Sequence, residues 1–229
     1  MTIYRYALIR GVRAPLSLAA NCIMPLAIMF IFPLWADGAM HGFSLLTLFV
    51  VGGAYLMSLN ILADKADGAV LRILAAPVTM RRYLTANLFA CMTPLIIQMT
   101  LVVLIGSVLH GWSLPLSMAL FLCYTVLTIT SVTMSFAWHC LFKDKESNPS
   151  NFSIVLTLML LLSGVFVPLE FFPGILQHTG AIFPVYWAVR SLDEALVARG
   201  MSVEYWQGIG AMLLFAVAFL LYGGKRRIV

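Results

Sequence analysis

The chain has 229 residues, of which 62% are hydrophobic and only 10% are charged, and its formal net charge is +5. A soluble domain carries about 25% charged residues, so a chain of this composition cannot cover its surface with polar groups. Apolar runs of about 20 residues, the length that crosses a bilayer, recur along the chain. The composition excludes a soluble globular protein and predicts an all-α integral membrane protein, because a backbone in lipid must satisfy its own hydrogen bonds.

The first segment, residues 1–13, predicts an amphipathic helix that lies along the membrane surface. Its apolar side chains are Ile3, Tyr4, Leu8 and Val12, and its basic side chains are Arg5, Arg10 and Arg13. The basic residues can meet anionic lipid headgroups, so the positive net charge requires no nucleic acid partner.

Six crossings are predicted, at 14–35, 43–63, 84–109, 114–142, 150–168 and 205–223. An even number of crossings places both termini on one side of the membrane. Twelve of the 14 Lys and Arg residues then fall on that side, and only Arg190 and Arg199 fall opposite. The excess of positive charge predicts that both termini are cytoplasmic.

The segment 64–82, between the second and third crossings, is charged but keeps an apolar face. Residues from Asp64 to Leu74 predict a short helix, and Pro77 ends it because proline disfavours helical geometry in the residue before it. Thr79 is the predicted N-cap of the next helix, whose first turns carry Arg81 and Arg82. Two interpretations remain open here: a helix that rests on the membrane surface, and a ledge that engages another protein.

The same segment resembles the one that follows the second crossing in permease subunits of the ABC-2 type, the membrane halves of ATP-driven exporters. The matching residues are Asp67, Gly68, Arg72, Ala76, Pro77, Val78, Tyr83 and Leu84. Position 67 departs from the family pattern, which more often has glutamate. The resemblance implies an ATPase-coupling surface formed by Asp64, Asp67, Gly68, Arg72, Pro77, Arg81 and Arg82, together with Arg5 and Arg10 of the amino helix.

A second stretch, residues 163–192, also resembles these permeases. Its matching residues are Ser163, Gly164, Pro168, Leu169, Glu170, Pro173, Pro184, Tyr186 and Arg190. The prolines interrupt any continuous span, and the apolar pieces between them are too short to cross, so 169–186 predicts a re-entrant hairpin at the external face. We expect an external gate there, formed by Pro168, Glu170, Phe171, Phe172, Pro173 and Pro184. The resemblance covers residues 1–229 as a single transmembrane domain.

The chain has no phosphate-binding GxxxxGK[ST] motif, so we expect no enzyme activity in this subunit and ATP hydrolysis on a separate one. No cofactor is expected on this chain, with ATP and Mg on the partner. The resemblance implies two copies of an ABC ATPase subunit and a second permease copy in a bacterial inner membrane. A homodimer is expected, and a heterodimer of two related permeases remains open.

The polar side chains inside the crossings are uncharged; examples are Asn21, Ser58, Asn60, Thr128 and Ser131. They fit hydrogen bonding between helices, and they equally fit a pathway lining. The absence of intramembrane charge argues against ion coupling. The expected cargo is amphipathic (a drug, antibiotic or peptide) and the resemblance implies export. The alternatives are a haem-related permease of the cytochrome c maturation type and an exporter of lipids or lipid-linked glycans.

Overall fold

The computed structural model describes residues 2–13, 17, 21, 23–35, 41–68, 79–142, 147–167, 171–174 and 179–225. Within these residues all regular structure is helical, as the sequence predicts. The α-helices are α1 (Thr2–Arg13), α3 (Met24–Ile28), α4 (His41–Ala66), α6 (Met80–Leu109), α7 (Leu114–Leu141), α8 (Ser147–Leu162), α10 (Pro184–Val197) and α11 (Val203–Lys225). Two short 3-10 helices, η2 (Phe32–Leu34) and η5 (Gly180–Ile182), complete the described structure.

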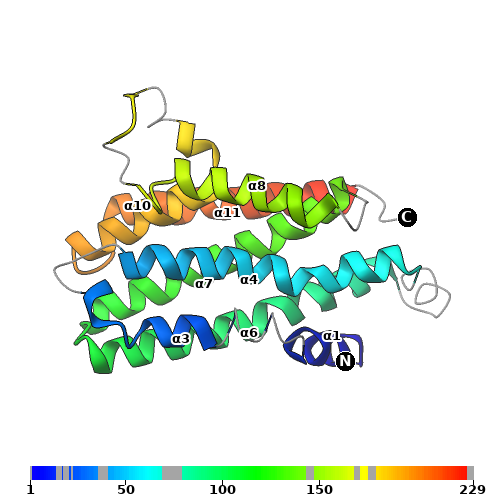
Figure 1. Cartoon of the computed structure of the whole chain (residues 1–229), viewed down its shortest axis with the longest axis horizontal. Helices are drawn as coiled ribbons and strands as arrows, with labels where there is room; N and C mark the ends of the chain where they lie inside the picture. Colours follow the sequence, from blue (N-terminus) through cyan, green and yellow to red (C-terminus); the bar gives the residue numbers. More distant parts are fainter. Residues whose placement is uncertain are drawn as a thin grey trace.

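The long helices lie side by side, and Figure 1 shows the start of α1 and the end of α11 at the same end of the bundle. We call this the amino end; it also holds the last turn of α4 and the first turn of α6. The connection between α6 and α7 and the start of α4 lie at the other end, which we call the far end.

Among the described residues, four helices are long and apolar enough to cross a membrane: α4, α6, α7 and α11. They correspond to the predicted crossings 43–63, 84–109, 114–142 and 205–223, which are therefore confirmed as membrane-length helices. The first predicted crossing, 14–35, lies partly outside the described residues. The count of six crossings stays a prediction.

The fifth predicted crossing, 150–168, is wrong at its carboxyl end. Helix α8 has 16 residues, about 24 Å at about 1.5 Å per residue, and stops at Leu162. The stop is a Schellman turn: the N–H of Val165 donates to the carbonyl of Leu160 at 3.2 Å, and that of Gly164 donates to the carbonyl of Leu161 at 3.4 Å. Gly164 has φ +81°, a left-handed conformation that glycine adopts without a steric penalty.

Helix α7 forms the centre of the bundle, where it packs against α4, α6, α10 and α11. Its buried apolar side chains include Leu120 and Leu127. Tyr124 is also buried, and its hydroxyl donates to the carbonyl of Phe43 on α4 at 2.9 Å. This arrangement explains why α7 carries so many hydroxyl residues: buried side chains such as Thr128 donate to their own helix and leave its surface well packed.

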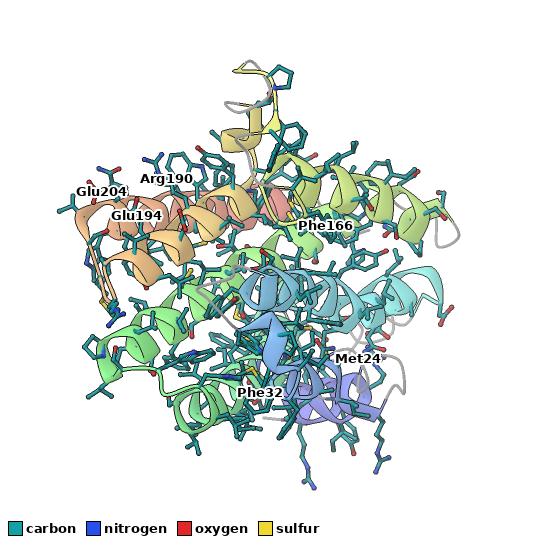
Figure 2. All side chains as sticks on the ribbon, turned by 60° about the vertical axis from the view of Figure 1, so that its left-hand side comes forward. Met24, Phe32, Phe166, Arg190, Glu194 and Glu204 are labelled. Atoms are coloured by element: carbon teal, nitrogen blue, oxygen red, sulfur yellow. The ribbon has the colours of Figure 1, made fainter. Side chains whose placement is uncertain are left out.

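The outside of the bundle is strongly apolar. Met24, Phe32 and Phe166 lie on the outside of the helices (Figure 2), and each exposes more than half of its surface. Exposed apolar side chains on this scale are costly in water but not in lipid. The surface therefore supports the assignment of the chain to a membrane.

Helix α10 pairs closely with α11 through a glycine contact. A Cβ atom at Gly208 would stand 2.0 Å from the Ser191 hydroxyl oxygen and 2.7 Å from the carbonyl oxygen of Trp187. Ser191 donates in turn to the carbonyl of Tyr205 at 3.2 Å. Pro184 occupies the first turn of α10, where its missing N–H costs nothing.

Candidate functional site: the amino-end clamp

A buried carboxylate joins three helices at the amino end. The guanidinium of Arg10, on α1, donates from Nη1 to Oδ1 of Asp64 at 2.6 Å and from Nη2 to Oδ2 at 2.8 Å. Nη2 also donates to the carbonyl of Asn60 on α4 at 3.2 Å. Two parallel bonds between a guanidinium and a carboxylate form the strongest geometry that this ion pair can take.

The third helix enters through Tyr83, in the first turns of α6. Its hydroxyl donates to Oδ2 of Asp64 at 2.7 Å. We call Arg10, Asp64 and Tyr83 the clamp. Asp64 and Tyr83 stand at the two ends of the charged segment, so the clamp holds the exit and the return of the chain together.

The segment itself begins differently from the prediction. A separate helix starting at Asp64 is wrong, because Asp64 belongs to the last turns of α4, which continues to Ala66. The chain turns at Asp67 and Gly68, and Gly68 has φ +66°, the left-handed geometry that ends many helices. Residues 69–78, including Arg72 and Pro77, lie outside the described residues.

The return of the segment agrees with the prediction. Thr79 is the N-cap of α6, and its hydroxyl accepts the backbone N–H of Arg82 at 3.4 Å. Arg81 and Arg82 lie in the first turn of that helix.

The electrostatics of the clamp follow from its burial. Asp64 is buried, and the Arg10 side chain exposes 44% of its surface. The hydrogen bonds to the Asp64 carboxylate raise the pKa of Arg10 above its ordinary value, so the guanidinium is charged at every physiological pH. A buried carboxylate with a bidentate arginine and a tyrosine hydroxyl has most of its lone pairs satisfied, which is the condition for a stable charge at this depth.

Helix α1 is seated by two further contacts. The hydroxyl oxygens of Tyr4 and Thr93 on α6 lie 3.0 Å apart. A Cβ atom at Gly11 would stand 3.0 Å from the sulfur of Met57, so glycine lets α1 approach α4 closely. The amphipathic helix predicted for residues 1–13 is thus confirmed as a helix, and it is tied to α4 and α6.

A cavity of about 770 Å³ opens beside the clamp. Tyr6 and Arg13 line it from α1, Asn60 and Asp64 from α4, and Tyr83 and Asn87 from α6. This cavity was not predictable from the sequence, because its walls come from three separate stretches of the chain.

Five charged members of the predicted ATPase-coupling set have side chains that the structure describes. Arg10 and Asp64 bind each other; Asp64 is buried, whereas the Arg10 side chain stays exposed. Arg5, Asp67 and Arg82 also have exposed side chains. The exposed side chains have the surface that a contact with a partner protein needs, and the buried Asp64 does not.

The predicted pathway residues are mostly interior. Asn21, Ser58, Thr128 and Ser131 are all buried in the single chain. Asn60 is partly exposed and lines the cavity beside the clamp. A cargo would reach the four buried residues only if the surrounding helices separated, and the pathway assignment stays a prediction.

A polar network that sequence reasoning missed contains Ser58. The Tyr55 hydroxyl donates to Oδ1 of Asn148 at 2.8 Å, and its ring stacks on Phe152, so α8 is joined to α4. Ser58 donates to the carbonyl of Tyr55 at 2.7 Å and lies 2.8 Å from Nε2 of His139.

The predicted external gate is only partly described. Pro168 and Glu170 lie outside the described residues. Phe171 exposes 78% of its surface, Phe172 is partly exposed and Pro173 is exposed, whereas Pro184 is buried at the start of α10. Their role as a gate, and the re-entrant hairpin at 169–186, stay predictions.

Comparison with known proteins agrees with the fold. No curated protein matches the sequence significantly. The family model described as ABC-2 family transporter protein matches residues 36–224, which run from before α4 to the last turn of α11 and include both stretches that resemble such permeases. Permeases of this family are membrane subunits that work with an ABC ATPase subunit and carry no ATPase domain of their own. The chain therefore belongs to the ABC-2 family of transporter proteins, as a multi-pass membrane permease.

Proposed function

We propose that the chain is the membrane subunit of an ABC exporter, and that two copies form the path for an amphipathic cargo. The cargo class is a drug, an antibiotic or a peptide. ATP is hydrolysed on a separate pair of subunits, and the segment 64–82 together with α1 transmits the resulting motion. Both termini are cytoplasmic in this proposal, in a bacterial inner membrane.

The observation that carries the proposal is the clamp. The charged segment leaves α4 next to Asp64 and returns to α6 next to Tyr83, and these side chains share a hydrogen bond. Arg10 adds α1 to the same point. A force applied to the segment by a partner therefore reaches two membrane-length helices and α1 through one buried carboxylate.

The clamp also suggests a division of labour among the coupling residues. Arg10 and Asp64 position the base of the segment through their ion pair, and the exposed side chains of Arg5, Asp67 and Arg82 contact the ATPase. ATP can shift the permease between two shapes only by the difference in affinity that the ATPase has for them. The exposed residues set that difference, and the clamp relays it.

The test is co-purification of the chain with its ABC ATPase, combined with charge reversal at Asp67. We expect Asp67→Lys to reduce the amount of bound ATPase and to abolish cargo-stimulated ATP hydrolysis, while insertion in the membrane is unchanged. Asp193→Lys is the matched control, because Asp193 is also an exposed aspartate but lies on α10. Unchanged pull-down and stimulation in Asp67→Lys would reject the docking role.

Transport is tested on the intact complex in vesicles. We expect movement of a fluorescent amphipathic probe that requires both ATP and the ATPase subunit. Movement by the purified chain alone, without nucleotide, contradicts the proposal.

A further inference from the structure

We propose that the cavity beside the clamp binds the anionic phosphodiester headgroup of a membrane lipid, with an acyl chain along α1. The proposal concerns a lipid that resides in the permease and does not depend on the ATPase contact or on the cargo.

The cavity lies where headgroups meet acyl chains. The candidate span of α6 begins at Arg82, and from this helix Tyr83 and Asn87 line the cavity. Both residues lie within about 8 Å of the start of the span at about 1.5 Å per residue. The cavity therefore lies beside the outermost part of a span, the depth at which headgroups give way to acyl chains.

One face of α1 supplies both kinds of wall that such a lipid needs. Ile3, Ala7 and Arg10 follow each other at helical spacing, with Tyr6 and Arg13 beside them. The apolar members stand toward the start of the helix and the guanidinium groups toward its end. An acyl chain can follow the first part while the headgroup meets the second.

The charge in the cavity suits a single phosphodiester. Two guanidinium groups, of Arg10 and Arg13, stand with one carboxylate, of Asp64, so the net charge is +1. In the part of the chain that the structure describes, no carboxylate pairs with Arg13. The clamp uses three of the five N–H donors of Arg10, which leaves two for a ligand.

The apolar wall favours a lipid over a free anion. Ile3, Ala7 and Ile9 line the same cavity as the charged groups. Inorganic phosphate could bind the guanidinium groups but would leave this apolar wall without a ligand. A lipid brings both a headgroup for the arginine and a chain for the apolar surface.

The experiment measures lipid binding to the full-length chain in detergent micelles by native mass spectrometry. Phosphatidylglycerol is the anionic probe, and phosphatidylcholine with identical acyl chains is the zwitterionic one. We expect phosphatidylglycerol to bind preferentially. We expect Arg13→Gln to weaken its binding about fivefold, because one basic contact near the membrane surface contributes about 1 kcal/mol.

Arg5→Gln is the matched control. It removes the same charge from the same helix, but Arg5 does not line the cavity. The binding of phosphatidylglycerol to this variant should therefore change less than about twofold. A second variant, Ala7→Trp, fills the apolar wall and leaves every charge in place. The Ala7→Trp variant should also bind phosphatidylglycerol more weakly than the parent chain.

Three results would overturn the proposal. Equal losses in Arg5→Gln and Arg13→Gln indicate general surface attraction rather than a site. Equal binding of phosphatidylglycerol and phosphatidylcholine indicates that the cavity does not distinguish an anionic headgroup from a zwitterionic one. Displacement of phosphatidylglycerol by inorganic phosphate, with Ala7→Trp unaffected, indicates a site for a free anion.

Discussion

The two ends of the helix bundle are held together by different kinds of contact. At the amino end, α1, α4 and α6 meet in the clamp, where Asp64 accepts three hydrogen bonds of 2.6 to 2.8 Å from Arg10 and Tyr83. At the far end, five rings pack against each other with centroids 5.1 to 5.9 Å apart. These rings, which we call the aromatic cluster, belong to Phe32, Trp35, Phe43, His110 and Trp112.

The far end outside this cluster is also charged, but differently. Arg190, Glu194 and Glu204 lie on the outer side of α10 and α11 in Figure 2. No ion pair joins them, since Arg10–Asp64 is the one ion pair among the described residues. Charge at the far end is therefore surface charge, whereas the amino end holds a structural ion pair beside its surface charges.

The contrast assigns different tasks to the two ends. Pairs of packed aromatic rings are worth about 0.5–1.5 kcal/mol each and depend on shape, so the aromatic cluster tolerates little displacement before it loses its contacts. The clamp depends on one carboxylate, and loss of that single charge removes a contact shared by three helices. The end that receives the ATPase in our proposal is thus the end that one local event can loosen.

The largest effect is expected for Asp64→Ala. The change leaves the Arg10 cation without its carboxylate and Tyr83 without its acceptor. Because water still reaches Arg10, we expect a loss of about 2–3 kcal/mol rather than the full cost of an unpaired buried charge. The measurement is the free energy of unfolding in mixed micelles, and Asp193→Ala on the exposed face of α10 is the control.

Asp64→Asn refines this prediction, since an amide keeps the shape and still accepts from Tyr83. We expect a smaller loss than for Asp64→Ala. If both variants are as stable as the parent chain, the clamp does not hold the amino end together.

A smaller effect is expected for Gly106→Ala at the far end. A Cβ atom at this position would stand 2.1 Å from the ring of Trp112, so the ring must move. Overpacking costs about 1–3 kcal/mol, and alanine recovers part of it through its helix propensity, so the net loss should be about 1 to 2 kcal/mol. Near-ultraviolet circular dichroism reports the displaced tryptophan.

Gly210→Ala is the matched control for Gly106→Ala. Gly210 lies on α11, and a Cβ atom there meets nothing within 4 Å. We expect it to leave the tryptophan signal unchanged and to stabilise the helix slightly. An unaltered tryptophan signal in Gly106→Ala would mean that the aromatic cluster is loosely packed.

The smallest effect is expected for Tyr83→Phe, which removes one hydroxyl and keeps the Arg10–Asp64 pair. A hydrogen bond to a charged group contributes about 1.5 kcal/mol or more when buried, but Asp64 keeps its arginine, so we expect a loss of about 1 kcal/mol. Tyr6→Phe is the control because Tyr6 is 70% exposed. A loss for Tyr83→Phe as large as that for Asp64→Ala contradicts the dominant role of the ion pair.

Local features of the chain were predictable where local physics decides them. The apolar runs that became α4, α6, α7 and α11 follow from the length that a bilayer requires. The Thr79 cap follows from a hydroxyl placed immediately before a helix. The end of α8 was also readable, because Gly164 is a typical residue for a left-handed helix terminus, but the apolar residues that follow it hid the stop.

The contacts within the clamp could not be predicted from the sequence. Arg10 and Asp64 were both predicted to act in coupling, on the assumption that their charges face a partner protein. The structure pairs them with each other across 54 positions of sequence. Nothing in the spacing of two charges on separate helices tells which of them will meet, and the Tyr83 hydroxyl gave no separate signal.

The sequence by itself determined that this is a membrane protein, which long apolar stretches are helices, and which family it belongs to, because these depend on composition and on short-range backbone chemistry. The tertiary structure alone decided which charges pair, which rings pack together at the far end, and that a cavity opens beside α1. Those features depend on how whole helices pack, and packing brings into contact side chains that are distant in the chain.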